Sequence, residues 1–294
     1  MDLTAELWIK ARHRLGESLI WHQARQVYIW VDLLDPAVVF FDPALGEVQS
    51  RKLDLSPPIG SLAATTDPRM VILAHRGGLS LLDLESWEFT PFCDPEGGRD
   101  AIIHNDIKVD PWGRLWVGTS HAREAEPRGA LWCVQSRSRW ALADAGFAVS
   151  NGPAFSADGR TMYFNDSAGL QTLAYDIGPD SLLARNRRVL VAHGPEDGLP
   201  DGLVVDATGD LWSAQWAGRA VLRLGRDGAP KGRIAVPAVN VTTLCFGGPK
   251  LDQLRIITAT DGVAPGDIEF LPLTGSLFQA SPGITGRAEP LFAL

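Results

Sequence analysis

The sequence predicts an all-β protein built as a six-bladed β-propeller. Three observations support this fold class. Short runs of β-branched and aromatic residues recur along the whole chain, segments with helical periodicity are rare, and a unit made of a turn followed by a strand repeats at a nearly constant interval. A ring of such units also brings corresponding residues of different repeats together around one axis, which directs the search for a functional site.

The predicted strands are short apolar runs bounded by Gly, Asp or Pro. These flanking residues favour turns, whereas Val, Ile, Tyr, Phe and Trp favour extended backbone. The clearest runs are Val27–Val31, Met70–Ala74, Leu115–Val117, Met162–Phe164 and Leu254–Thr258.

The turn-and-strand unit occurs six times, with starts spaced by 42 to 50 residues. The starts are Trp21, Asp67, Asp110, Ser156, Asp206 and Gly248. A repeat of this length, with strands and no helix in the unit, is typical of propeller blades. A β-sandwich with regularly spaced hairpins is the alternative, but a sandwich is not expected to keep so even a spacing.

The length and composition of the chain agree with one propeller. The chain has 294 residues, of which 45% are hydrophobic and 21% are charged, so it can bury a large core. No low-complexity linker or shift in composition divides it. We therefore expect a single six-bladed propeller domain over residues 1–294.

The charge balance narrows the range of partners. The formal net charge is −8, and no run of basic residues is longer than the pair Arg187-Arg188, which disfavours nucleic acid and anionic membranes as partners. Three widely spaced cysteines, a charged amino terminus and no apolar stretch of about 20 residues favour a cytoplasmic protein without a membrane span. We expect a monomer or a weak oligomer.

The repeat register singles out a set of polar residues. Positions four or five residues before the repeat starts are Glu17, Leu62, Asn105, Asn151, Asp201 and Thr243. In a ring these positions lie at one depth, so the oxygens of Glu17, Asn151 and Asp201 can meet and bind one divalent cation. Calcium, magnesium and manganese prefer such donors, and zinc or iron is also compatible. The alternative is that Asn151-Gly152 and Asp201-Gly202 merely form turns.

Several ordered motifs resemble those of one known family. The motifs are Leu15-Gly16-Glu17-Ser18, Asn105-Asp106, Asp110-Pro-Trp-Gly-Arg-Leu-Trp116, Ser150-Asn-Gly152, Pro200-Asp-Gly202 and Phe246-Gly-Gly-Pro249. Together they resemble the regucalcin (senescence marker protein), gluconolactonase and luciferin-regenerating-enzyme-like family. The matches are spread over nearly the whole chain.

The resemblance implies a six-bladed propeller that opens the lactone ring of a sugar acid at a single central metal. It implies that Glu17, Asn151 and Asp201 hold this metal and that Asn105 contacts the substrate. The lactone is an aldonolactone such as a glucono-, xylono- or arabinono-lactone, and neither the lactone nor the metal is fixed by the sequence.

The sequence departs from the family pattern at two substrate positions. Ile103 stands where family members commonly have Arg, and Arg123 stands where regucalcin has Glu. Our hypothesis is that Arg123 or His121 supplies the missing cation and suits an acidic or differently substituted sugar. His104 also flanks a substrate position and is a further candidate for substrate binding.

Hydrolysis of a lactone needs a polarised carbonyl group and an activated water. The cation would polarise the carbonyl, and either Asp201 as the base or a hydroxide on the cation would supply the nucleophile. Two other functions remain open: a non-enzymatic propeller that binds calcium or a protein partner, and an esterase or phosphotriesterase on the same scaffold.

Overall fold

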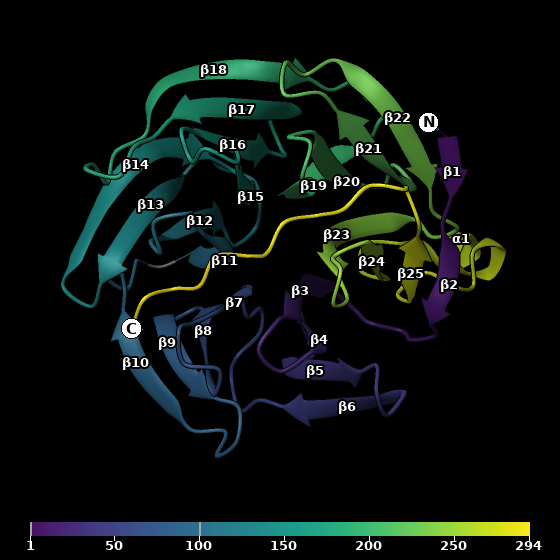
Figure 1. The fold of residues 1–294 in the computed structure, drawn as a ribbon, viewed down its shortest axis with the longest axis horizontal. Coiled ribbons are helices and arrows are strands. Elements are labelled where there is room, and N and C mark those ends of the chain that lie inside the picture. Colours follow the sequence, from purple (N-terminus) through teal and green to yellow (C-terminus); the bar gives the residue numbers. More distant parts are fainter. Residues whose placement is uncertain (1, 100) are drawn as a thin grey trace.

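The computed structural model describes residues 2–99 and 101–294, and these residues form six β-sheets around one axis (Figure 1). From the innermost strand outward, the first three sheets are β3 (Gly16–His22), β4 (Val27–Asp32), β5 (Ala37–Asp42) and β6 (Glu47–Lys52); β7 (Leu62–Ala64), β8 (Met70–His75), β9 (Gly78–Asp83) and β10 (Phe89–Cys93); and β11 (Ile102–Val109), β12 (Leu115–His121), β13 (Gly129–Ser136) and β14 (Arg139–Phe147).

The other three sheets follow in the same order. They are β15 (Ser150–Phe155), β16 (Thr161–Asp166), β17 (Gln171–Asp176) and β18 (Arg185–Ala192); β19 (Leu199–Val205), β20 (Leu211–Trp216), β21 (Ala220–Leu224) and β22 (Pro230–Ala235), extended by β1 (Asp2–Thr4); and β23 (Asn240–Gly247), β24 (Gln253–Ala259), β25 (Leu277–Ala280) and β2 (Glu6–Ile9). The prediction of an all-β six-bladed propeller is confirmed.

The predicted apolar runs form the second strand of their blades. They lie within β4, β8, β12, β16 and β24, and nearly all of their side chains are buried. A second strand is packed between the blades on both faces, so it reads as a continuous apolar run rather than an alternating one. Five of the six predicted repeat starts fall at the turns that join the innermost strand of each blade to this second strand, and Trp21 lies in β3 just before such a turn.

Two of these turns contain a buried Asp that holds a Trp of the second strand. Asp110 Oδ2 accepts a hydrogen bond of 2.8 Å from Trp116 Nε1, and Asp206 Oδ2 accepts one of 2.9 Å from Trp212 Nε1. Asp110 also forms an ion pair with Arg114, in which both side chains are buried. The turn motif thus fixes the packing between blades as well as the direction of the chain.

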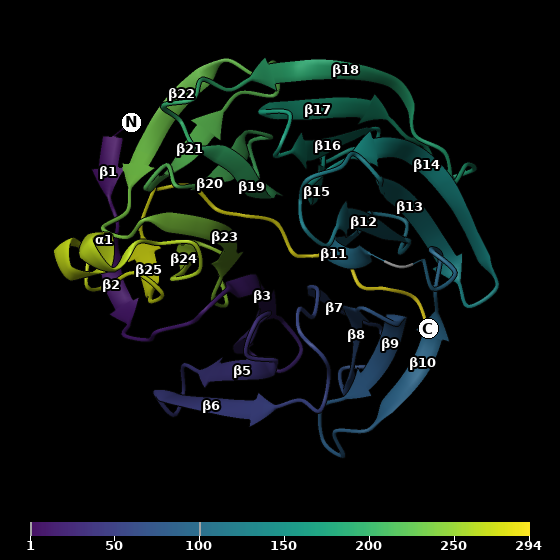
Figure 2. The ribbon, with the colours of Figure 1, turned by 180° about the vertical axis from the view of Figure 1, so that it is seen from behind.

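The ring is closed by the amino-terminal strands (Figures 1 and 2). β2 pairs antiparallel with β25, so the amino-terminal strand completes the blade that the carboxy-terminal part of the chain begins. β1 adds in parallel to β22 of the neighbouring blade. Because both ends of the chain contribute to the last two blades, hydrogen bonds across β2 and β25 resist opening of the ring.

The last blade also departs from the predicted pattern of hairpins without helices. A six-residue helix, α1 (Pro265–Phe270), stands between β24 and β25 and begins at a Pro, which favours the first turn of a helix. Within the part of the chain that the structure describes, no helix is long and apolar enough to cross a lipid bilayer.

Residues 281–294, which we call the C-terminal strap, run across the middle of the ring after β25 (Figures 1 and 2). The strap is fixed near its start, where Gly286 N donates to Leu251 O over 2.7 Å. It is fixed again near its end, where Phe292 is buried and exchanges backbone hydrogen bonds of 2.9 Å with Ala64 and Thr66. The intervening residues 287–291 therefore span one end of the central axis.

Candidate functional site

The innermost strands bring the predicted metal-binding residues, together with the predicted substrate contact Asn105, to one end of the central axis. Glu17 lies on β3, Asn105 on β11, Asn151 on β15 and Asp201 on β19, and all four line one cavity of about 280 Å³. The structure thus brings together residues that are far apart in the sequence. The repeat register identified these positions because equivalent strands contribute equivalent residues to a ring.

A β-bulge lies beside each of these residues. The pairing of the innermost strand with its neighbour shifts after Glu17, after His104, after Asn151 and after Pro200. A bulge interrupts the alternation of side chains along a strand and can redirect one of them. Four blades therefore use the same local irregularity at the level of the cavity.

Glycines that follow two of the site residues allow this backbone path. Gly152 has a φ of +79°, a conformation that residues with a side chain rarely adopt. At Gly202, a Cβ atom would collide with Thr243 Oγ1 and would lie 2.8 Å from Thr242 O of the adjacent β23. Both glycines lie within strands, so the alternative interpretation that Asn151-Gly152 and Asp201-Gly202 form turns is wrong.

A chain of side-chain amides fixes the position of Asn151. Asn105 Nδ2 donates to Asn151 Oδ1 over 3.0 Å and to Ser150 O over 2.8 Å. On its other side, Asn151 Nδ2 donates to Ser167 Oγ over 2.9 Å. These bonds orient the amide so that its oxygen lies on the side of Asn105, and a carbonyl oxygen with two lone pairs can accept a second partner.

Three carboxylates of the innermost strands repel one another electrostatically. Removal from water raises the pKa of Asp201 well above its ordinary value, and the charges of Glu17 and Asp106 raise it further. Burial followed by the charge of Asp106 raises the pKa of Glu17 in the same way. Asp106 accepts a hydrogen bond of 2.9 Å from Gly152 N, next to Asn151.

The donor set fits a hard divalent cation. Glu17 and Asp201 offer carboxylate oxygens, Asn151 offers an amide oxygen, and no Lys or Arg is among the described residues that line the cavity. A cation would relieve the repulsion between the carboxylates, which no side chain of the cavity wall does. Among residues 2–99 and 101–294, no three or more His, Cys, Asp or Glu side chains are grouped so that they could hold a metal ion. The assignment therefore rests on two carboxylates together with the amide oxygen of Asn151.

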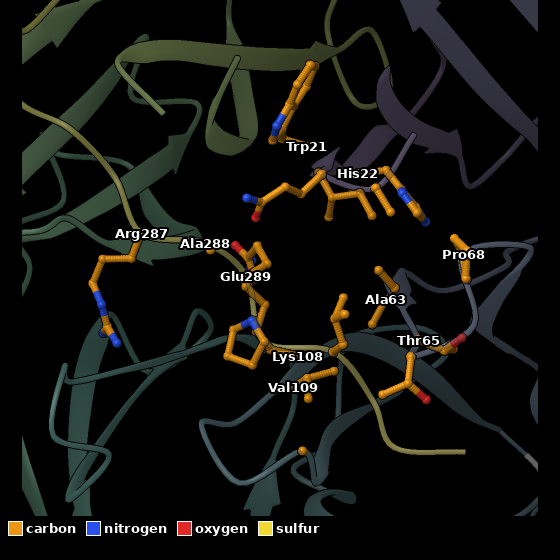
Figure 3. A pocket seen from close by; sticks show the side chains of 18 of the residues that line it. Trp21, His22, Ala63, Thr65, Pro68, Lys108, Val109, Arg287, Ala288 and Glu289 are labelled. Carbon is orange, nitrogen blue, oxygen red and sulfur yellow. The ribbon is translucent and has the colours of Figure 1, made fainter. Parts of the chain in front are cut away.

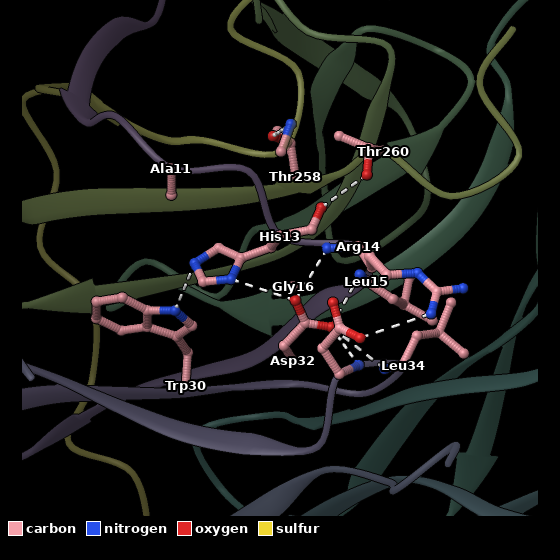
Figure 4. A network of polar contacts seen from close by, with 12 residues as sticks. Ala11, His13, Arg14, Leu15, Gly16, Trp30, Asp32, Leu34, Thr258 and Thr260 are labelled. Atoms are coloured by element: carbon pink, nitrogen blue, oxygen red, sulfur yellow. Dashed lines mark hydrogen bonds and ion pairs between the residues drawn. The ribbon is translucent and has the colours of Figure 1, made fainter. Parts of the chain in front are cut away.

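The turn that leads into Glu17 is held by Asp32 and His13 (Figure 4). The Asp32 carboxylate accepts hydrogen bonds from Arg14 N over 2.9 Å and Leu15 N over 3.2 Å, and it lies 3.4 Å from His13 Nδ1. Trp30 Nε1 donates to His13 Nε2 over 3.0 Å, which leaves Nδ1 to carry the proton toward Asp32. Burial alone would raise the pKa of Asp32, but these hydrogen bonds outweigh it and lower the pKa.

Three other residues predicted to bind substrate are not among those that line the cavity. His104 is buried with its Nδ1 3.1 Å from His75 O and its Nε2 3.3 Å from Asp94 Oδ1. His121 is buried and accepts a hydrogen bond of 3.3 Å from Ala125 N, while Arg123 is exposed. A role of these residues in substrate binding stays a prediction.

Sequence reasoning missed Glu124 and Asp261, which line the outer part of the cavity together with Trp216. Glu124 has a φ of +56°, so the chain turns at this residue and not at Arg123. Burial and the charge of Asp261 raise the pKa of Glu124. The repeat register did not include this loop, so it gave no signal for Glu124 or Asp261.

Comparisons with known proteins agree with the observed fold. The model of the SMP-30/Gluconolactonase/LRE-like region matches residues 15–260. A 6-deoxy-6-sulfogluconolactonase of Pseudomonas putida is 30% identical over 293 residues, covering 100% of both chains, and a pentonolactonase of Haloferax volcanii is 31% identical over 283 residues, covering 94% of each. The crystal structure of a calcium-binding regucalcin of Agrobacterium tumefaciens superimposes with a TM-score of 0.93 at 25% identity, covering 100% of this chain and 99% of that one.

Proposed function

The chain belongs to the SMP-30/gluconolactonase/LRE-like family, and on this premise we propose that it hydrolyses a sugar-derived lactone at a divalent cation held by Glu17, Asn151 and Asp201. The observation that carries the proposal is the meeting of two carboxylates and a fixed amide oxygen in one cavity of about 280 Å³, a size suited to a small ligand. Two relatives that span nearly the whole chain are named as lactonases, which supports this reaction over the other activities of the scaffold.

The residues of the cavity have complementary roles in the proposed reaction. When bound, the cation would act as a Lewis acid on the lactone carbonyl. Asp201 accepts a proton from the water that attacks the carbonyl carbon. The bond between the acyl carbon and the ring oxygen then breaks, and the ring oxygen takes up a proton, so one water is consumed and one hydroxy acid is formed. Asn105 orients Asn151 and borders the substrate.

The charge of the cavity supports a neutral lactone as substrate. Its described lining contains four carboxylates and no Lys or Arg; the carboxylates are Glu17, Glu124, Asp201 and Asp261. The rest of the lining is mostly apolar and includes Leu15, Leu199 and Trp216. A negative charge on the substrate would lie near the outer carboxylates Glu124 and Asp261, and no Lys or Arg of the described lining would pair with it. The name of the Pseudomonas relative indicates a sulfonated sugar, so the two proteins are proposed to differ here.

The first test of the proposal uses a panel of five- and six-membered aldonolactones, aryl esters and an aryl phosphotriester. The hydrolysis of each compound is measured by pH-stat titration of the acid released. We expect hydrolysis of the aldonolactones with an added divalent cation, loss of activity with a chelator and recovery when the cation is returned. Tight cation binding without turnover of any compound would support the non-enzymatic alternative. Faster turnover of the aryl ester or phosphotriester than of every lactone would support the esterase alternative.

A second prediction concerns substrate charge. We expect kcat/KM for a neutral lactone such as xylonolactone to exceed that for an aldaric monolactone, which carries a free carboxylate, by about tenfold, since ~1.4 kcal/mol of repulsion gives this ratio. Glu124→Gln should reduce the ratio. Arg123→Glu should leave it unchanged if Arg123 stays outside the cavity.

The same assay decides the competing hypothesis for Arg123. A preference of the native protein for the acidic lactone, lost in Arg123→Glu, would contradict the neutral-substrate proposal and support a substrate contact by Arg123.

A further inference from the structure

Ser167 lies between two of the proposed cation ligands and contacts the strands that carry both. It follows β16, lines the carboxylate cavity and is only 3% exposed. Its Oγ accepts a hydrogen bond of 2.9 Å from Asn151 Nδ2 and donates to Pro200 O, directly before Asp201. Asn151 belongs to β15 and Pro200 to β19, so one buried hydroxyl joins the innermost strands of two neighbouring blades.

The backbone sets the direction of these hydrogen bonds. Pro200 O is a carbonyl oxygen and can only accept, so the hydroxyl proton of Ser167 points to it. The oxygen of Ser167 is then the acceptor toward Asn151, and within the Asn151 amide only the NH₂ group can donate. The amide oxygen of Asn151 must therefore lie on the side away from Ser167.

A second backbone carbonyl imposes the same direction from the other side. Asn105 Nδ2 donates to Ser150 O over 2.8 Å, and its second proton goes to Asn151 Oδ1 over 3.0 Å. A reversed Asn151 amide would place its NH₂ group against the NH₂ group of Asn105 and its oxygen against the oxygen of Ser167. Asn151 is 7% exposed, so these mismatched groups would find little water to compensate them.

The orientation of the amide decides whether Asn151 can bind a cation. Hard divalent cations bind the carbonyl oxygen of an Asn side chain, whereas its NH₂ group only donates hydrogen bonds. The end of β16 holds the other ligand as well, because Asn165 Nδ2 donates to Asp201 O and Asn165 is fully buried. The same short segment therefore contacts the side chain of one ligand and the backbone of the other.

We propose that Ser167 is a positioning residue of the cation site, which directs the amide oxygen of Asn151 toward the cation and couples it to the strand that carries Asp201. The inference rests on the proposed function, since it concerns the same site. Ser167 acts through Asn151 and is not itself proposed as a ligand. Residues that hold the ligands of a metal typically contribute roughly 10–100-fold to its affinity.

The test compares Ser167→Thr with Ser167→Val, two variants of nearly the same shape of which only the first keeps the hydroxyl. In Ser167→Val a methyl group occupies the place of the hydroxyl, so a water molecule cannot replace it. The affinity for Mn²⁺ alone, without lactone, is measured by calorimetry. We expect Ser167→Thr to bind Mn²⁺ about tenfold or more tightly than Ser167→Val.

The variant Asn151→Asp separates this role from a general effect on the site. A carboxylate has an oxygen at both positions, so it has no direction that Ser167 could fix. In the Asn151→Asp background the ratio of the two affinities should fall to about twofold or less. A tenfold ratio that persists there, or equal affinities of the two variants in the native background, would overturn the proposal.

A buried hydroxyl at the opposite end of the central axis supplies the matched control. Thr65 is 1% exposed, and its Oγ1 lies 2.9 Å from both Asp67 O and Met70 O. It lines a separate cavity of about 630 Å³ between the ring and the C-terminal strap (Figure 3). Thr65→Val should lower Tm but keep the Mn²⁺ affinity within about twofold of the native value. A loss as large as that in Ser167→Val would contradict a specific role of Ser167.

The native chain provides a second measurement that needs neither cation nor lactone. The Asn151 Nδ2 proton donated to buried Ser167 should exchange with water about tenfold or more slowly than the side-chain amide protons of Asn186, which is exposed. The resonance is assigned by its loss in Asn151→Asp. Exchange as fast as that of Asn186 would overturn the inference.

Failure of this inference and failure of the proposed function are distinguishable. Mn²⁺ binding that depends on the hydroxyl of Ser167, without turnover of any lactone, would support the positioning role and contradict the hydrolysis. Cation-dependent hydrolysis in a chain whose Ser167→Thr and Ser167→Val variants bind Mn²⁺ equally would support the hydrolysis and overturn the positioning role.

Discussion

Replacing Asp201 by Asn is expected to lower kcat/KM for lactone hydrolysis by roughly a thousandfold or more, because Lewis-acid and proton-transfer catalysis together contribute several kcal/mol. The substitution keeps the shape of the side chain and removes the charge that we propose binds the cation and accepts the proton. Divalent cation affinity, measured by calorimetry, should fall in parallel. Glu17→Gln should have the same two effects.

Asp201→Asn is also expected to raise the thermal stability of the chain when the cation is removed. Enclosure and mutual repulsion raise the pKa values of Glu17 and Asp201, so their ionised forms destabilise the folded state. A raised pKa contributes stability that is present at low pH and lost as the pH rises through the folded pKa. At pH 8 with a chelator, Asp201→Asn should therefore have a Tm a few degrees above that of the native chain, and the gain should shrink as the pH falls.

Glu124→Gln is the matched control, since Glu124 lines the same cavity but its side chain is more exposed than that of Asp201 and its pKa is raised less. It should change Tm little. A metal-free Asp201→Asn variant that melts below the native chain, or that retains most of the cation-dependent activity, would contradict the assignment of Asp201 as a ligand and base.

Replacing Asp110 by Ala is expected to destabilise the fold by about 3–5 kcal/mol. Asp110 is fully buried, accepts hydrogen bonds from Trp116 Nε1 and the turn amides, and pairs with Arg114, whose side chain is 3% exposed. Its removal leaves a guanidinium group buried without its counter-charge. Since about 1 kcal/mol lowers Tm by roughly 2–4 °C in a chain of this size class, a Tm decrease on the order of 10 °C should follow in thermal unfolding.

The equivalent turn between β15 and β16 supplies the control. Asp158 accepts hydrogen bonds from Ser156 Oγ over 2.7 Å and Arg160 N over 3.0 Å, but it is exposed. Asp158→Ala should cost less than about 1 kcal/mol. Similar losses in the two variants would show that the turn bonds, and not the buried contacts with Trp116 and Arg114, account for the effect.

The sequence predicted those parts of the site that the repeat constrains. Glu17, Asn105, Asn151 and Asp201 occupy corresponding places in different blades, so a spacing found by alignment of turns predicted which residues share one cavity. Asp106 was visible only as part of a motif, because its effect depends on its distance from Asp201 and Glu17. Glu124 was missed since it lies on a loop outside the repeat.

The sequence by itself determined the six blades and the residues at the carboxylate end, because a repeated local pattern of turns and apolar strands is preserved in every blade. Only the tertiary structure decided what lies at the other end of the axis. The pairing of Lys108 with Glu289 joins positions distant in sequence, and the strap follows no repeat. The end of β3 became part of a cavity wall only when the strap crossed the ring, since enclosure is a property of packed surfaces and not of any one segment.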